Sequence, residues 1–209
     1  MQAKTALPLV VLLCAAPLLS ACLNTPPAPP PRPEPAARSG RERVTEPAAS
    51  APANAAATGG RPALALSGAQ GRAGEVVTIS ATLATAGDSI AGTQNDITFD
   101  PSQISVVAKA NGKPDCSPNG QLGKEGTAFS FQPPHCQQQA CTGVRALVLS
   151  LSNVAPIPNG SVLYTCKVAI SSQASAGTHQ LSVTNAAFSN PTGGAISAAS
   201  TNGAVTVGR

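Results

Sequence analysis

Four cysteines are the residues whose side chains could most clearly form bonds to each other or to a metal: Cys116, Cys136, Cys141 and Cys166. With His135 nearby they could hold zinc, but their spacing matches no common zinc knuckle. An even number of cysteines in a chain with an export signal favours two disulfides. Three pairings are possible. We expect one disulfide between Cys116 and Cys136, which would close one long polar loop. We expect the other between Cys141 and Cys166, which would link the end of that loop to a later strand.

The acidic residues and histidines after residue 62 do not form a catalytic pattern. His135 and His179 are far apart, and no Gly-x-Ser-x-Gly turn accompanies them. Asp100 precedes Pro101 and is better explained as a turn former than as half of a carboxylate pair for glycoside hydrolysis. The acidic residues are Glu75, Asp88, Asp96, Asp100, Asp115 and Glu125. We therefore expect a binding protein with no enzymatic activity, cofactor or metal site.

The N-terminus has the pattern of an export signal. A lysine near the start, an apolar stretch from Ala6 to Leu19 and small residues before Cys22 indicate a signal peptide over residues 1–21. The segment Leu19-Ser20-Ala21-Cys22 resembles the lipobox of bacterial lipoproteins, in which the cysteine is acylated. The resemblance implies lipid attachment at Cys22 and, because Leu23 follows instead of aspartate, the outer membrane of a Gram-negative cell. The alternative is an ordinary signal followed by an ordinary cysteine.

Residues 22–62 are rich in proline and alanine, with hardly an apolar side chain larger than alanine. Such a segment cannot bury enough surface to offset the entropy of ordering it, so we expect a disordered, partly extended tether. The chain carries a net charge of +4, but several arginines lie in this segment. The remainder is close to neutral and lacks the basic, aromatic surface of nucleic-acid-binding proteins.

From residue 63 to residue 209 the sequence alternates short apolar strands with turn residues, and no stretch keeps a helical period. This pattern predicts a single all-β domain of eight to ten strands, arranged as a two-sheet β-sandwich. The predicted strands are Ala63–Ser67, Val76–Leu83, Asn95–Phe99, Ile104–Val107, Ala146–Leu151, Val162–Ile170, Gln180–Val183 and Ala204–Val207.

Several stretches of this domain resemble, in order and spacing, the cohesin domains of cellulosome scaffolds. They are Gly71–Ile79, Ile97–Ile104, Asn159–Val168, Ala174–Gly177 and Gly203–Val207. The resemblance covers roughly residues 64–207. It implies a nine-stranded jelly-roll sandwich and calcium-dependent adhesion to dockerin modules on polysaccharide-degrading enzymes.

The resemblance places the partner surface on the sheet that contains the third, fifth and sixth strands. With Ile97 and Phe99 in the core, the alternate residues of that strand face outward. With Leu147, Leu149 and Leu151 also inward, Ala146, Val148 and Ser150 would be exposed beside Lys167. The expected partner-binding residues are Gln94, Asp96, Thr98, Val148, Ser150 and Lys167. An ordinary solvated sheet face has the same composition.

Residues 111–142, which contain three of the four cysteines, depart from the scaffold-cohesin pattern. This insert also carries Phe129 and Phe131, the only plausible pair of rings for stacking on a sugar. A carbohydrate-binding module on the same lipid tether is therefore the alternative to a protein-binding module, and an envelope spacer without a ligand is a third. Exposed, coplanar rings would favour the carbohydrate-binding alternative.

Overall fold

The computed structural model describes residues 60–209. The predicted signal peptide (1–21), Cys22 and the tether as far as residue 59 lie outside the described residues. Within the described range, no helix has the length and apolar character needed to cross a membrane.

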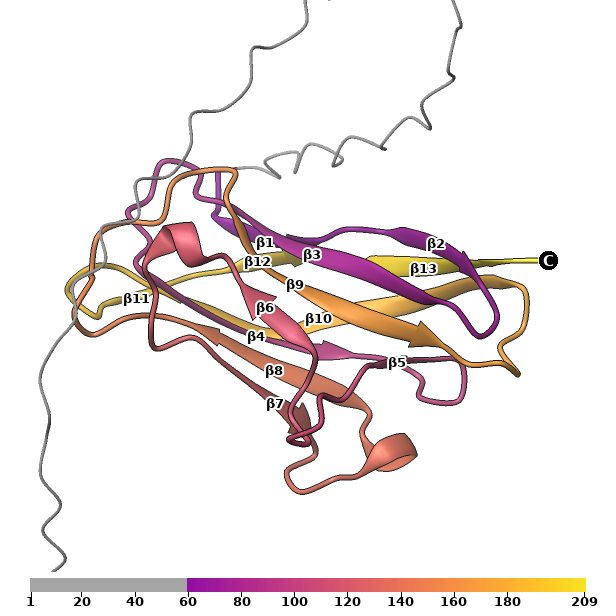
Figure 1. Cartoon of the computed structure of the whole chain (residues 1–209). Coiled ribbons are helices and arrows are strands. Elements are labelled where there is room, and N and C mark those ends of the chain that lie inside the picture. The colour runs from indigo at the N-terminus through magenta and orange to yellow at the C-terminus, as the bar shows by residue number, and fades with distance from the viewer. Residues whose placement is uncertain (1–59) are drawn as a thin grey trace, which may run out of the picture. The chain divides into compact units, whose positions relative to one another are not determined.

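The described residues form two β-sheets that stack as two layers (Figure 1). The first sheet has the order β12 (Ala199–Thr201), β1 (Ala63–Leu66), β3 (Val76–Ala84), β9 (Val162–Ile170) and β5 (Ile104–Val106), and β6 (Cys116–Pro118) also pairs with β9. The second has the order β2 (Ala69–Arg72), β13 (Gly203–Gly208), β10 (Gly177–Ser189), β4 (Gly92–Thr98), β8 (Gly143–Val148) and β7 (Ala128–Gln132), and β11 (Ala195–Ile196) pairs with β10.

This architecture confirms the predicted all-β jelly-roll sandwich. All eight predicted strands overlap observed ones, and the helical content of residues 60–209 is limited to two 3-10 turns, η1 (Gly120–Leu122) and η2 (Gln138–Ala140). There are more strands than the nine expected because short strands such as β2, β6, β11 and β12 extend the sheets. Most pairs are antiparallel, whereas β1 with β12 and β2 with β13 are parallel.

The core lies between the two sheets and is filled from alternating positions of their strands. Ile79 and Leu83 of β3 face it from one side, and Ile97 of β4 faces it from the other. One polar contact crosses this core, because the Tyr164 hydroxyl of β9 donates to Asn95 Oδ1 of β4 at 3.0 Å. Burial raises the pKa of the Tyr164 hydroxyl, so it remains a hydrogen-bond donor. The pair connects the two layers at a fixed position.

The structure contains two disulfides, but the pairing predicted from the sequence is wrong. Cys116 pairs with Cys166, and Cys136 pairs with Cys141. The first pairing follows from β6, which places Cys116 directly opposite Cys166 on the neighbouring strand β9, with Cα atoms 4.0 Å apart. The second closes a short loop around η2, between β7 and β8. With all four thiols in disulfides, none remains as a thiolate ligand for zinc.

Candidate functional site

The candidate site is the outer face of the second sheet, formed by β10, β4, β8 and β7. Strand register decides which side chains lie on it. Gln94 is opposite Leu147 on one side and Ala187 on the other, and Asp96 is opposite Arg145 and Thr184. We call this surface the outer face. Its residues are Gln94, Asp96, Thr98, Ala128, Ser130, Arg145, Leu147, Leu149, Ser182, Thr184, Asn185 and Ala187.

The side chains of β8 have the opposite orientation to the one predicted. Val144, Ala146 and Val148 are buried, and Arg145, Leu147 and Leu149 point outward and are partly exposed. Register enforces this arrangement, because Val144 lies opposite the core residue Ile97 and Ala146 lies opposite Asn95. The expectation that the leucines fill the core was therefore wrong, and they face solvent instead.

Three of the six predicted partner-binding residues are not available on this face. Val148 is 1% exposed and belongs to the core. Ser150 is buried, and its hydroxyl donates to Glu125 Oε2 at 2.6 Å. Lys167 lies on β9 in the first sheet, where its ammonium pairs with Asp115 at 3.0 Å. Gln94, Asp96 and Thr98 do lie on the side of β4 that was expected, but Asp96 is buried beneath Arg145 and Asn185.

A charged pair occupies the middle of the outer face. Arg145 Nε and one of its amino groups donate to the two oxygens of Asp96 at 2.7 and 2.8 Å, and Asn185 Nδ2 donates to the second oxygen at 2.8 Å. The Arg145 guanidinium holds the pKa of Asp96 below its usual value, assisted by Asn185 and opposed by burial. The same contact raises the pKa of Arg145. Asp96 is therefore an ionised carboxylate whose charge is neutralised in place.

The position of Asn185 depends on an irregularity in β10. The pairing of β10 with β4 shifts between Thr184 and Ala187, and Asn185 has a φ of 51° in the left-handed region. Asparagine adopts this conformation more readily than most residues. The bulge thus turns the amide toward Asp96.

A shallow depression of about 160 Å³ lies at one end of the outer face, between Leu147, Leu149 and Ala187. Gly92 forms part of its lining, and a Cβ at this position would approach Ser189 Oγ to 2.8 Å. The absence of a side chain at Gly92 therefore leaves room for the Ser189 hydroxyl at this end of the outer face.

The loop that follows β8 also exposes apolar side chains. Leu151 is 93% exposed and Val154 is 49% exposed. The loop is nevertheless held firmly, because the Lys124 ammonium donates to the carbonyls of Asn153 and Ala155 at 2.8 Å each. Burial lowers the pKa of Lys124. The exposed side chains are thus displayed by an anchored loop.

Phe129 and Phe131 point away from the outer face. Both are partly buried and pack against the core, and the ring of Phe129 meets that of Tyr164 edge-on, with centroids 5.3 Å apart and planes at 66°. They share one face of β7, and that face is the inner one. The pair therefore does not form an exposed platform for a sugar.

Comparison with solved structures identifies the fold. In a crystal structure of a CaDoc0917-CaCohA2 complex, the matching chain is 19% identical, with 70% of this chain and 99% of that chain covered and a TM-score of 0.58. The domain has a cohesin fold. A type I cohesin complex from Clostridium thermocellum, Coh-OlpA-Doc918, matches the cohesin-like domain at 13% identity, with 70% and 99% covered and a TM-score of 0.56.

A non-cellulosomal cohesin from the archaeon Archaeoglobus fulgidus also matches, at 11% identity, with 71% and 92% covered and a TM-score of 0.53. No protein-family model and no curated protein sequence matches the chain. Of the third, fifth and sixth strands predicted from the sequence, Asn95–Phe99 and Ala146–Leu151 overlap β4 and β8 of the second sheet, whereas Val162–Ile170 is β9 of the first sheet. The outer face therefore contains two of the three strands expected to carry the partner surface.

The sequence contained one signal that could have corrected the orientation of β8. The predicted strand began at Ala146 and so left out Arg145, which shares its side of the strand with Leu147. A strand that begins at Gly143 cannot bury Leu147 without burying Arg145 as well.

Proposed function

We propose that the domain is a protein-binding module that receives a dockerin-type partner on the outer face. Similar cohesins have been solved as complexes with dockerins, among them Coh-OlpA-Doc918 and Coh-OlpC-Doc435. Binding rather than catalysis suits this surface, because its single acidic side chain, Asp96, is already paired with Arg145.

The observation that carries this proposal is the outward orientation of Leu147 and Leu149. A single exposed leucine on a protein surface needs no explanation. Here two leucines on one face line the same depression, and Leu151, two residues further along the chain, is 93% exposed. Apolar side chains gathered at a depression and rimmed by polar residues are typical of protein interaction sites.

The charged pair suggests the chemistry of the partner. The Arg145 side chain is 43% exposed. Its Nε and one of its two amino groups donate to Asp96, which leaves the other amino group without a role in this pair. Because a guanidinium is a planar fork, its remaining amino group points away from Asp96 and can donate to a partner. The matching surface would present apolar side chains to Leu147 and Leu149 and a carboxylate or hydroxyl oxygen to Arg145.

The test is direct titration of the oxidised protein with purified dockerin modules, with and without calcium. Leu147→Asp and Leu149→Asp should each weaken binding at least about tenfold, because a carboxylate would be buried against apolar surface. Val76→Asp is the matched control, since Val76 is also exposed (55%) but lies on the first sheet. Equal binding by all variants would place the partner elsewhere, and retention on insoluble polysaccharide without dockerin binding would favour a carbohydrate-binding module.

We further propose that the domain is tethered to the cell envelope through a lipid on Cys22, with export directed by residues 1–21. The support is the sequence alone: a signal-like segment that ends in a lipobox-like Leu-Ser-Ala-Cys. More than one acyl chain would be needed for stable anchoring. Cells grown with an alkyne-labelled fatty acid should label the protein, and Cys22→Ser should abolish labelling and release the protein from the outer-membrane fraction. Unchanged labelling in the variant would contradict this assignment.

A further inference from the structure

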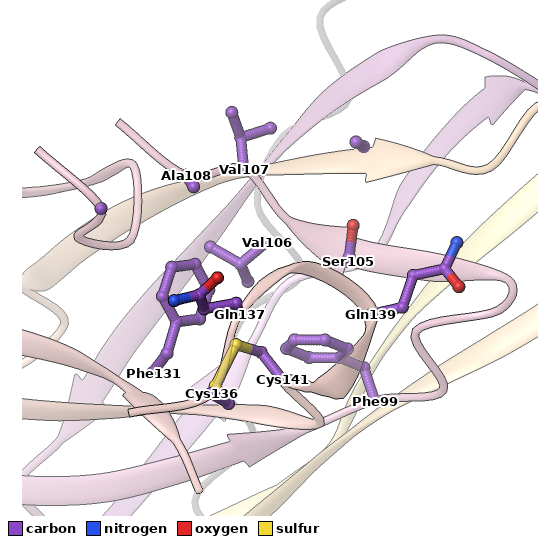
Figure 2. A pocket seen from close by; sticks show the side chains of 12 residues that line it. Phe99, Ser105, Val106, Val107, Ala108, Phe131, Cys136, Gln137, Gln139 and Cys141 are labelled. Carbon is purple, nitrogen blue, oxygen red and sulfur yellow. A yellow bond between two sulfur atoms is a disulfide. The ribbon is translucent and has the colours of Figure 1, made fainter. Parts of the chain in front are cut away.

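A second concavity lies on the opposite side of β7 and β8 from the outer face. Its volume is about 490 Å³, and it is bounded by the edge strand β5 and by the Cys136–Cys141 loop (Figure 2). One wall therefore belongs to the first sheet and the other to residues 111–142, which depart from the scaffold-cohesin pattern. Nothing in the proposed dockerin-binding role uses this cavity.

The lining is apolar and carries no net charge. Phe99, Val106 and Cys141 are buried core residues that reach the cavity, and Phe131 adds a second aromatic ring. In the view of Figure 2, the two rings lie on either side of the disulfide. No lysine, arginine, aspartate or glutamate belongs to the lining among the described residues.

Polar groups are present, but they are few and neutral. Gln137 and Gln139 come from the disulfide loop, and Ser105 comes from β5. Both glutamines are exposed, so their amides are in water near the opening of the cavity rather than in its floor. Each amide can both donate and accept a hydrogen bond.

The walls are held in position by strand pairing, a disulfide and a backbone hydrogen bond. Val106 pairs with Val168 in the first sheet, and Phe131 pairs with Val144 in the second. The loop is closed by its disulfide, and the Thr142 amide donates to the Gln132 carbonyl at 2.9 Å at its base. The space therefore exists before a ligand arrives, which reduces the entropy lost on binding.

We propose that this cavity binds a small uncharged molecule with an aromatic or branched aliphatic body and one hydrogen-bonding group at its open end. Its volume falls within the range of small-molecule sites, about 300–1,000 Å³. Water in such a site finds few partners, so an apolar ligand gains by replacing it. A charged ligand is excluded, because the lining offers no opposite charge to offset its desolvation.

The experiment uses the full chain with both disulfides formed and the neutral fluorescent probe N-phenyl-1-naphthylamine. The expected result is saturable enhancement of probe fluorescence. Ala108→Trp should weaken binding at least tenfold, because Ala108 is an exposed lining residue and an indole there would fill the opening. Ala169→Phe, which fills the cavity from β9, should have the same effect. Ala110→Trp is the matched control, since Ala110 is also exposed but does not line the cavity.

Two results would overturn the proposal. The first is the absence of saturable binding, or equal binding by all three variants, which would show that the probe does not occupy this cavity. The second is a loss of dockerin binding in Ala108→Trp without any probe binding, which would assign the cavity to a side chain of the protein partner. Circular dichroism of each variant confirms that the sheets are intact. Failure of dockerin titrations alone would leave the small-molecule site unaffected, because the two surfaces share no residue.

Discussion

Asp96→Asn is the substitution that best separates the roles of the charged pair on the outer face. The change removes an ionised acceptor of three hydrogen bonds, two from Arg145 and one from Asn185. A hydrogen bond to a charged group contributes about 1.5–3 kcal/mol. Because the Arg145 side chain is 43% exposed, solvent screens much of that interaction. We expect a loss of about 1–2 kcal/mol at pH 7, or roughly 2–8 °C in Tm.

The effect should depend on pH in a defined direction. Arg145 lowers the pKa of Asp96 in the folded state from the usual 3.8, so the ionised carboxylate stabilises the fold. That contribution is complete above pH 3.8 and is lost as the pH falls through the lowered folded value. The difference in stability between the wild type and Asp96→Asn should therefore be largest at neutral pH and should shrink in acid.

Thermal unfolding followed by circular dichroism at pH 7, 5 and 3 measures this difference. Asp88→Asn serves as the control, because Asp88 is exposed and has no ion-pair partner within residues 60–209. The reasoning would be refuted if Asp96→Asn lowered Tm equally at pH 7 and pH 3. It would also be refuted if the control showed the same loss as Asp96→Asn at pH 7.

Three further predictions follow from burial and connectivity. Val148→Ala should destabilise the domain by about 2 kcal/mol and Leu147→Ala by less than about 1 kcal/mol, because only Val148 faces the core. Urea unfolding measures both losses. A larger loss for Leu147→Ala would support the orientation of β8 that was predicted from the sequence. Replacing the Cys116–Cys166 pair by alanines should cost about 4 kcal/mol and replacing the Cys136–Cys141 pair about 2 kcal/mol, since the disulfides span 50 and 5 residues. Equal losses in chemical denaturation would contradict the loop-length argument. Tyr164→Phe should cost about 1–3 kcal/mol by leaving a buried amide oxygen without its donor, and an unchanged denaturation midpoint would show that this contact is not stabilising.

The sequence predicted the strands well wherever one face is apolar and the other polar. At the end of β4, Ile97 and the following Phe99 alternate with Asp96 and Thr98, so both the strand and its orientation could be read directly. In β8 both faces are apolar from Ala146 onward, and side-chain size gave the wrong answer. The orientation there is fixed by register with β4, which is a property of the assembled sheet.

The remaining errors have the same origin in long-range pairing. The disulfide pairing depends on β6, a strand of three residues that lies opposite β9 although 50 residues separate the two cysteines. Lys167 was assigned to the outer face because β9 follows β8 along the chain, yet β9 belongs to the other sheet. Local patterns identify strands, but they do not identify which strands become neighbours.

Strand pairing in this domain determines when the chain can complete its folding. In the first sheet Ala63 pairs with Ala199, and in the second Ala69 pairs with Val205, so each sheet joins segments that lie 136 residues apart in the chain. Such non-local pairing makes folding slow, because distant segments must meet before either sheet is complete. A chain threaded N-terminus first through a narrow membrane pore, as the proposed signal peptide requires, has to remain unfolded until it has crossed. The sandwich cannot be completed until β12 and β13, the last two strands of the described residues, have emerged.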